Sequence, residues 1–551
     1  MNLEFLDKLT YTQYAVELEL KDAAQFNWFH GPALSSLLCR VFNRHPLGSN
    51  IAILPIESGI TEYSANERYR FGFTIFGNED NNPQKIADGL RLEGRAPYST
   101  SVFPKFEVVY VNEVPCTPFK HDPLLAQYDI RLVTPLRMER KEPLPGKRFF
   151  DPAFFDGSRF LRLLHSRIYD TAKLCCNDLP PYNPPDVPEV VVDNMELLWV
   201  DAPYHNDTKT CGGITGLLKL TARLDECWQK IFFLGQITHA GRNASLGFGN
   251  YECMQLPILR HTEPARSWLD RMIAPSNLSE VYNHIKLNGE KTGSGDMPRG
   301  CCENTFDVNI GELHDSVKSN VYKSKPLYGV VIPKPGGKTC RTLAIPCNAD
   351  RVLQRAMCRI LGPSIDMLLE ENSFAYRKGF SRISAAHAID RARREGYQYV
   401  LRSDINAFFD TVSWNKLERK LNALFREKKL VELLMSWVRQ DVVFNGRTIK
   451  RSCGLPQGAA ISPLLANLYL DEFDDALGDD FKLIRYADDF VVLCRSEETA
   501  KMTLERAREA LKPLSLEIKP EKTEIVDFEH GFQCLGYLFC RSLTKEVRAN
   551  E

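Results

Sequence analysis

Two adjacent acids in the C-terminal half are the residues best placed to do chemistry. Asp488 and Asp489 stand between the apolar stretches 483–486 and 490–493, which predicts a strand, a tight turn and a second strand. Carboxylates at the tip of a hairpin repel each other unless a cation neutralises them, and such oxygen ligands suit Mg²⁺. Because Asp-Asp is also an ordinary solvated turn, the interpretation depends on residues upstream.

A third acid, Asp404, ends a β-prone run at 399–404 and is followed by a pair of phenylalanines. Beside the hairpin, Asp404 would complete a cup of three carboxylates for two metal ions. Two ions about 3.5–4 Å apart can activate an attacking 3′-hydroxyl and stabilise a leaving pyrophosphate. For an isolated aspartate at a strand end, the competing explanation is a helix cap.

Two further segments have residues suited to a nucleotide. The glycine-bracketed loop at 454–458 lets backbone approach a ligand, and its Gln457 can hydrogen-bond an incoming nucleotide or the template. Ser462 followed by Pro463 predicts that a helix begins directly after this loop. Upstream, two adjacent glycines between apolar runs predict a hairpin. The hairpin carries cations suited to a triphosphate, namely Lys334, Lys338 and Arg341.

Residues from about 310 to 540 resemble a reverse transcriptase of the group II intron lineage, with its motifs in order. The Lys-Pro-Gly-Gly-Lys hairpin is followed by Phe-Ala-Tyr-Arg-Lys-Gly-Phe-Ser at 374–381, the Asp404 strand, the Leu-Pro-Gln-Gly loop and the Tyr-Ala-Asp-Asp turn. Segments 516–523 and 531–537 match the last motifs. The resemblance implies an RNA-directed DNA polymerase with right-hand fingers and palm. No thumb is evident before the chain ends at Glu551.

The resemblance also implies roles for single residues, with an RNA template, a primer and dNTPs as substrates. Two Mg²⁺ ions, for which Mn²⁺ is a possible substitute, are expected at Asp404, the adjoining Ile405, Asp488 and Asp489. Lys522 matches a lysine proposed to protonate the leaving pyrophosphate. Phe409 matches the bulky side chain that rejects a 2′-hydroxyl, although Phe-Phe pairs are also common in cores. The remaining expected nucleotide-binding residues are Lys334, Lys338, Arg341, Gln457 and Gly458.

The N-terminal half alternates β-prone runs with short helices. We expect strands at 13–20, 69–77, 106–111 and 215–220, and helices at 32–42 and 160–175. This α+β pattern is compatible with two ferredoxin-like units in tandem. A Gly-rich, polar stretch at 288–300 suggests a boundary between the halves. The expected domains are an RNA-binding domain at 1–265, a linker at 266–308, and fingers and palm at 309–551.

A glycine-rich loop near the end of this half could bring backbone amides close to RNA phosphates. Its residues include Gly241, Arg242, Gly247 and Gly249. The run His-Ala-Gly-Arg-x-x-x-Leu-Gly-Phe-Gly-Asn-Tyr resembles the signature of CRISPR repeat-processing endoribonucleases of the RAMP superfamily, with an RRM-like fold. Segments 29–34, 132–137 and 212–218 match further. One family of CRISPR adaptation proteins joins such a nuclease to a group II-like reverse transcriptase. The resemblance therefore implies CRISPR repeat RNA and an integrase complex as partners.

Cleavage by such a nuclease would need no metal, because a base activates the RNA 2′-hydroxyl against the adjacent phosphate. Histidine suits this role since its ordinary pKa lies near neutrality. The candidates are His239, ahead of the glycine loop, His30, at the first helix, and His45. Each has an alternative explanation as a packed or capping residue.

Composition adds limits on compartment and partners. The 551 residues have a formal net charge of −1, which argues weakly against nucleic acid, yet 377–394 holds six basic residues against only Asp390. A solvated helix face explains such a stripe equally well. No apolar run reaches the length of a membrane span, and the start lacks a signal-peptide pattern. The 16 cysteines contain no Cys-x-x-Cys, so we expect reduced thiols and a prokaryotic cytoplasm.

Three hypotheses follow. The first is a bifunctional CRISPR protein that cleaves repeat RNA and copies RNA into DNA for spacer acquisition. In the second, the N-terminal half only binds RNA and delivers it to the polymerase. The third is a retroelement-type intron protein, which predicts a maturase or endonuclease region that this sequence does not display.

Overall fold

The computed structural model describes residues 5–77, 82–95, 103–144, 147–149, 152, 155–176, 178–204, 209–241, 243–260, 263–291, 308–333, 340–478, 481–541 and 543–546. The chain divides into two compact units. Unit one comprises Met1–Ser267 and Lys420–Arg426, and unit two comprises Trp268–Arg419 and Glu427–Glu551.

The first half of unit one is a βαββαβ arrangement with an antiparallel four-stranded sheet. Its strands lie in the order β3-β5-β1-β6. Pro32 in the first turn of α2 suits a helix start, because its missing N–H has no partner there in any case. The elements in chain order are β1 (Tyr11–Leu20), α2 (Gly31–Val41), β3 (Ile51–Leu54), β5 (Arg68–Phe76), α3 (Pro83–Arg95) and β6 (Phe106–Val114).

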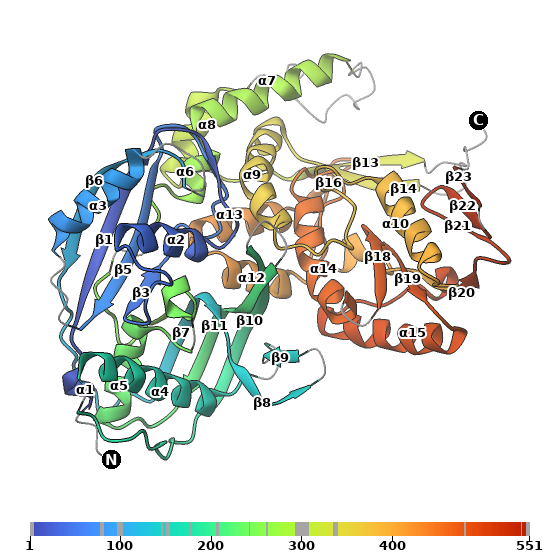
Figure 1. Ribbon diagram of the computed structural model, residues 1–551. Helices are drawn as coiled ribbons and strands as arrows, with labels where there is room; N and C mark the ends of the chain where they lie inside the picture. Colours follow the sequence, from blue (N-terminus) through green and yellow to red (C-terminus); the bar gives the residue numbers. More distant parts are fainter. Residues whose placement is uncertain are drawn as a thin grey trace. The chain divides into compact units, whose positions relative to one another are not determined.

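The second half of unit one repeats both the element order and the strand order. Its sheet runs β10-β11-β7-β12, and α4 and α5 pack side by side (Figure 1). Asp156 and Asp225 cap these helices by accepting hydrogen bonds from the amides of Arg159 and Trp228. The elements are β7 (Gln127–Leu136), α4 (Gly157–Cys175), β10 (Val191–Tyr204), β11 (Lys209–Thr221), α5 (Glu226–Thr238) and β12 (Tyr251–Cys253). The same βαββαβ order in both halves is that of the ferredoxin-like unit.

Every strand and helix expected in the N-terminal half is present. The strand expected at 13–20 is β1, the helix expected at 32–42 is α2, and the helix expected at 160–175 is α4. The other three expected strands fall within β5, β6 and β11. The elements that were not expected, such as β3 and α5, carry weaker periodicity or are very short.

Unit two contains two four-stranded sheets in which most neighbouring strands are antiparallel. In the first, β14 (Cys340–Ile345) and β13 (Leu327–Pro333) form the expected hairpin, and β16 (Val442–Phe444) and β17 (Arg447–Ile449) extend it. The second sheet positions the candidate acids. Its strands, in spatial order, are β18 (Lys482–Tyr486), β19 (Asp489–Cys494), β15 (Tyr399–Asp404) and β20 (Glu524–Asp527).

Helices cover both faces of this second sheet (Figure 1). Val491 and Leu493 point into a core shared with α10 (Arg382–Arg394). On the opposite face, Phe490 packs on Phe473 of α14 (Ser462–Gly478), and α15 (Glu497–Leu511) covers Cys494. Alternate residues of β19 therefore serve two cores, which is why the strand is apolar throughout.

The segment expected as a linker, 266–308, is largely helical where it is described. It forms α6 (Trp268–Met272) and α7 (Pro275–Lys291), which pack on α9 within unit two, while 292–307 lie outside the described residues. Within the described ranges, every helix is too short or too polar to serve as a membrane span. The remaining elements are α1 (Phe5–Lys8), β2 (Ala24–Gln25), β4 (Glu62–Tyr63), β8 (Glu139–Leu144), β9 (Lys147–Phe149), η2 (Ala244–Leu246), α8 (Ile310–Lys318), α9 (Asn348–Asp366), α11 (Phe408–Thr411), α12 (Trp414–Leu424), α13 (Lys428–Val438), η4 (Lys512–Leu514), η5 (Pro520–Lys522), β21 (Phe532–Cys534), β22 (Tyr537–Cys540) and β23 (Leu543–Glu546).

Candidate active sites

The three acids singled out in the sequence meet at one edge of the β18-β19-β15-β20 sheet. Asp404, the last residue of β15, lies directly opposite Asp489, the first residue of β19. Asp488 occupies the turn between β18 and β19, after Ala487 with a positive φ of 61°. The amide of Ile405 donates to the carbonyl of Asp488 at 3.0 Å, so the turn is tied to the end of β15.

Burial and repulsion make Asp488 and Asp489 hard to ionise. The pKa of Asp489 is raised to about 6, first by burial and then by the charges of Asp488 and Asp404. The pKa of Asp488 is also raised, mainly by burial, and the charge of Asp404 acts in the same direction. A cation at this edge would relieve the repulsion, so the donor set fits a hard divalent ion.

Lys522 already supplies one positive charge to this cluster. Its ammonium pairs with the carboxylate of Asp404, and this hydrogen bond is the first cause of the raised pKa of Lys522. The amide of Lys519 donates to the carbonyl of Asp404 at 2.7 Å, which holds the preceding loop against β15. With Asp404 paired in this way, no three His, Cys, Asp or Glu side chains in the described ranges are grouped as a ready metal site.

The glycine loop lies against the segment that carries Phe409. The amide of Leu455 donates to the carbonyl of Phe409 at 2.6 Å, and a Cβ on Gly454 would come within 2.6 Å of the same oxygen. Glycine is therefore required by this close approach, and by its φ of 86°. Phe408 is buried and Phe409 is half-buried, so Phe409 is the ring of the pair that can meet a ligand.

The rest of the predicted nucleotide site is partly placed. The carbonyl of Gln457 accepts from the amide of Ala344 in β14, and Gly458 adopts a φ of 114°. The loop is thereby linked to the hairpin that carries the expected cations. Arg341 lies in β14 opposite Ile332, but its side chain is outside the described part of the structure, as are Lys334 and Lys338 altogether.

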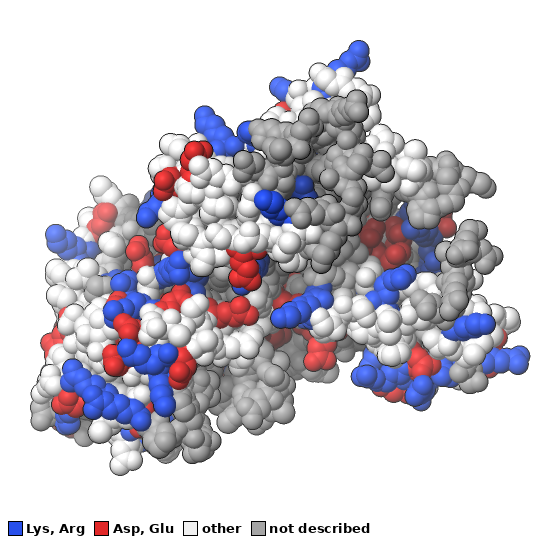
Figure 2. Space-filling model, turned by 90° about the horizontal axis from the view of Figure 1, so that it is seen from above, with Lys and Arg blue, Asp and Glu red and all other residues white. Residues whose placement is uncertain are grey.

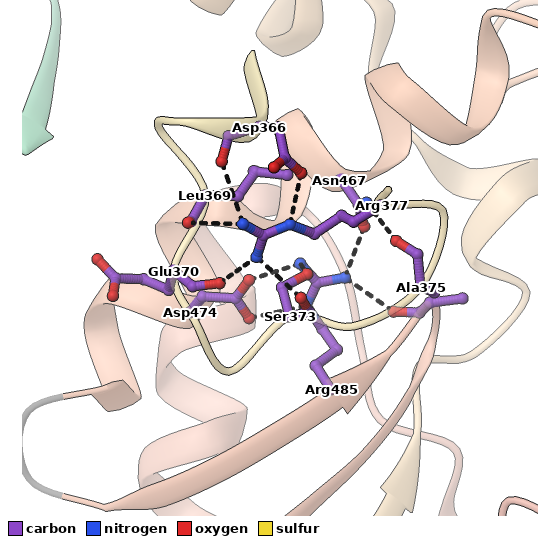
Figure 3. Close-up of polar contacts among 10 residues, drawn as sticks. Asp366, Leu369, Glu370, Ser373, Ala375, Arg377, Asn467, Asp474 and Arg485 are labelled. Carbon is purple, nitrogen blue, oxygen red and sulfur yellow. Dashed lines mark hydrogen bonds and ion pairs between the residues drawn. The ribbon is translucent and has the colours of Figure 1, made fainter. Parts of the chain in front are cut away.

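A buried arginine behind the turn that holds Asp488 was not recognised in the sequence. The Arg485 guanidinium and the Asp474 carboxylate are both fully buried and form a two-pronged ion pair at 2.7 and 2.5 Å (Figure 3). The other guanidinium protons go to Asn467 at 3.1 Å, the Ser373 hydroxyl at 2.7 Å and the carbonyl of Ala487 at 3.1 Å. All five N–H donors are used, and one of them holds the turn itself. The signal in the sequence was a charged residue inside an apolar strand.

The basic stripe at 377–394 is smaller than its sequence indicated. Arg377 is only 7% exposed and pairs with Asp366, while Arg393 and Arg394 both pair with Asp390. The exposed basic residues are Lys378, Arg382, Arg391 and Arg394, the last of them paired with Asp390. On the face shown in Figure 2, acidic and basic side chains are interspersed across the described surface. Any contact with phosphates therefore depends on a few local cations.

In unit one, His239 is part of the scaffold. It is 3% exposed; its Nδ1 donates to the carbonyl of Phe248 at 3.1 Å, and its Nε2 accepts from the Asn250 amide at 3.0 Å. Burial, together with the charges of Arg260 and Arg167, lowers the pKa of His239 to about 3. With both ring nitrogens occupied, His239 has no atom to offer to an RNA hydroxyl in this geometry.

His30 is enclosed in the same manner. It is 1% exposed, its Nε2 donates to the carbonyl of Ile60 at 2.9 Å, and its Nδ1 accepts from the Tyr69 hydroxyl at 2.9 Å. Its ring also stacks on Tyr69. Burial and hydrogen bonding therefore argue against His239 and His30 as the base, and that assignment stays a prediction.

The third histidine differs from these two. His45 is exposed, in the turn that follows α2, and the described residues show no hydrogen bond to its ring. The 3₁₀ turn η2 of the glycine loop packs against α2. Of the three candidates, His45 is the one whose ring an RNA can reach.

The glycine loop is used to build unit one. Gly241, Gly247 and Gly249 all have positive φ, of 75°, 83° and 71°. A Cβ on Gly249 would lie 1.9 Å from the carbonyl oxygen of Ala240. The amides of 247, 248 and 249 donate to carbonyls within the unit, so they are not available to phosphates, contrary to our expectation. Arg242 lies outside the described residues.

Comparison with known families identifies the class of the C-terminal unit. Residues 332–539 match the family model described as "Reverse transcriptase (RNA-dependent DNA polymerase)". Protein YkfC of Escherichia coli (strain K12) is 27% identical over 43% of this chain and 73% of its own length. The group II intron-encoded protein LtrA of Lactococcus lactis subsp. cremoris is 28% identical over 35% of this chain and 33% of its own length. Unit two therefore contains a reverse transcriptase domain.

A likeness to solved structures extends over both units. A chain of the "Partial Cas6-RT-Cas1--Cas2 complex" has a TM-score of 0.59 and 22% identity, over 92% of each chain. A chain of the "Cas6-RT-Cas1--Cas2 complex" matches with the same values over 92% of this chain and 57% of its own. This likeness concerns the fold. In fold, both units resemble chains of the Cas6-RT-Cas1--Cas2 complexes, as the predicted resemblance implied.

Proposed function

We propose that the chain is an RNA-directed DNA polymerase that works with two Mg²⁺ ions held by Asp404, Asp488 and Asp489. The observation that carries the proposal is the meeting of these three acids at one sheet edge, where burial and repulsion disfavour the charge of Asp488 and Asp489. Bound divalent ions would polarise the attacking 3′-hydroxyl and stabilise the leaving pyrophosphate. Ion binding requires the carboxylates to converge, with Asp404 released from Lys522.

The other residues of unit two would bind and orient substrates. Lys522 carries a proton at Nζ, which suits transfer to the leaving pyrophosphate. Phe409 would pack beneath the sugar and exclude a 2′-hydroxyl. Gln457 and Gly458 would contact the nucleotide or template, and the triphosphate would be bound by Lys334, Lys338 and Arg341.

Extension of a DNA primer on an RNA template tests this function. The full chain should incorporate dNTPs with Mg²⁺ or Mn²⁺ and should stop when EDTA is added. Phe409→Ala should retain dNTP incorporation and raise rNTP incorporation by roughly ten-fold or more, because the steric exclusion is lost. The exposed Glu498→Gln is a matched control on α15. Failure of the wild-type chain to extend any RNA-templated primer would contradict the proposal.

For unit one, we propose binding and metal-independent cleavage of CRISPR repeat RNA, within a complex that also contains a CRISPR integrase. The proposal is supported by the two βαββαβ halves and by the fold likeness over 92% of the chain. His45 is the residue that we propose as acid or base, because its ring is accessible. Spacer acquisition from RNA would then combine the two units' activities.

Cleavage in EDTA separates this proposal from its alternatives. Repeat RNA should be cut at one position to a 2′,3′-cyclic phosphate end, and His45→Ala should abolish the cut. Tight binding without cleavage by the wild-type chain would make unit one an RNA-delivery module. Preference for an intron RNA over repeat RNA would favour a retroelement-type enzyme instead.

A further inference from the structure

Tyr376 has a backbone conformation that its side chain disfavours. Its φ is +61°, in the left-handed region where a Cβ crowds the neighbouring carbonyl. Its side chain is 57% exposed, so burial in a core does not compensate for this strain. Strain of this kind persists only where the surrounding structure imposes it, and it is typical of functional positions.

The residues on both sides of Tyr376 are fixed (Figure 3). The carbonyl of Ala375, which is fully buried, accepts from the Asn467 amide at 2.8 Å. On the other side, the Arg377 guanidinium donates to the Asp366 carboxylate at 2.6 Å. Arg377 also donates to backbone carbonyls at and after the end of α9, those of Asp366, Leu369, Glu370 and Ser373. Tyr376 thus lies between two anchored residues.

The same contacts connect this segment to the catalytic turn. Residues 372–374 run beside β18, because Arg485 donates its amide to Asn372 at 2.8 Å and accepts from the amide of Phe374 at 2.9 Å. Asn467 binds both the carbonyl of Ala375 and the Arg485 guanidinium, which in turn donates to the carbonyl of Ala487. Tyr376 directly follows Ala375, just as Asp488 directly follows Ala487 in the turn after β18.

Electrostatics agree with this placement. The pKa of Tyr376 is raised, first by partial desolvation of the phenol and then by the charge of Asp488 and by Tyr486. No hydrogen bond of the phenol group is found among the described residues. The exposed ring therefore lies close enough to Asp488 to feel its charge, and its hydroxyl is available to a ligand.

We propose that Tyr376 is a substrate-binding residue that packs its ring against the 3′-terminal nucleotide of the primer. The inference rests on the proposed polymerase function, because the carboxylate turn acts on the primer 3′-hydroxyl. An aromatic ring is a sequence-independent platform for a base or sugar, as a copying enzyme requires. The two arginine networks anchor the backbone on both sides of Tyr376 and the carbonyl that precedes Asp488.

Substitution by glycine separates a binding role from a structural one. Tyr376→Gly relieves the strain, so its melting temperature should equal or exceed that of the wild type. Its KM for primer–template should rise by about ten-fold, as expected for the loss of one aromatic stack, while its KM for dNTP changes little. Tyr376→Phe keeps the ring and should stay within about two-fold of the wild type.

Asn445→Gly is the matched control. Asn445 is exposed, has a φ of 48° and lies in the turn between β16 and β17, so glycine relieves the same kind of strain away from the acids. This variant should gain or keep stability with unchanged KM.

An active wild type whose Tyr376→Gly variant keeps the wild-type KM for primer–template would overturn the proposal, as would an effect confined to the KM for dNTP. A lower melting temperature of Tyr376→Gly would assign the ring to packing and also overturn it. An inactive wild type would instead contradict the polymerase function.

Discussion

The two units hold their candidate residues in opposite ways. In unit two, Asp404, Asp488 and Asp489 are brought to one sheet edge, and the supporting charge, Arg485, is buried behind them. In unit one, the histidines singled out by position, His30 and His239, are themselves the buried support. A chemically suitable side chain is thus informative only when the local fold leaves its reactive atom accessible.

The difference arises from how much of each site is local in sequence. A strand–turn–strand places two acids at a hairpin tip, and pairing with one further strand adds the third acid. The histidine environments depend on residues from separate segments, such as Ile60 and Tyr69 around His30. Their burial is a property of the packed unit.

The largest expected effect comes from substituting Arg485, which supports the turn before Asp488 in unit two. Arg485→Ala leaves the Asp474 carboxylate buried without its partner, which should cost roughly 3–5 kcal/mol of stability. RNA-templated extension should also be lost, because the carbonyl of Ala487 loses its donor. Calorimetric melting and primer extension measure the two effects. In comparison, Ser373→Ala removes one hydrogen bond and should cost roughly 1 kcal/mol. Full extension by Arg485→Ala would show that the turn does not need this support.

Acid should destabilise unit one through its buried histidines. Burial lowers the pKa of His239 to about 3 and that of His165 to about 4. The unfolded chain binds protons below about pH 6.5 whereas the folded unit does not, so stability is complete above that pH and falls toward pH 4. Each histidine should cost about 2 kcal/mol at pH 5. Melting curves at pH 7.5 and 5 measure the loss, and His239→Gln and His165→Gln should each reduce it. An unchanged pH response in both variants would contradict the structural role.

A smaller effect is expected when substitutions of two histidines in unit one are compared. His239→Ala removes one hydrogen bond from the Asn250 amide and one from the carbonyl of Phe248, which should cost roughly 1–3 kcal/mol. His45→Ala, at an exposed turn, should change stability by less than about 0.5 kcal/mol. Thermal melting of the two variants beside repeat-RNA cleavage distinguishes them. Loss of cleavage with full stability in His239→Ala would restore that residue as a catalytic candidate.

Much of the fold could be predicted from the sequence, but less of the candidate sites could. The apolar runs around Asp488 predicted β18 and β19, and Ser462-Pro463 predicted the start of α14. Periodicity also predicted β1, α2 and α4. It did not reveal that Arg485 is a core residue, because this depends on partners as distant in the chain as Ser373. Nor did it reveal that Arg377 binds carbonyls around the end of α9, because irregular backbone has no periodicity. The sequence correctly singled out Gly247 and Gly249 as unusual, but their positive φ and close packing account for the glycines.

The most direct test of the account is primer extension by a variant with Asp488→Asn and Asp489→Asn together. Asparagine keeps the shape and removes the charge that a divalent ion requires. We predict that extension on an RNA template falls by at least about a thousand-fold, in the range of losing a metal-based step, while the melting temperature is unchanged or higher because repulsion is relieved. Extension at the wild-type rate by this folded variant would contradict the assignment of the carboxylate edge as the polymerase site.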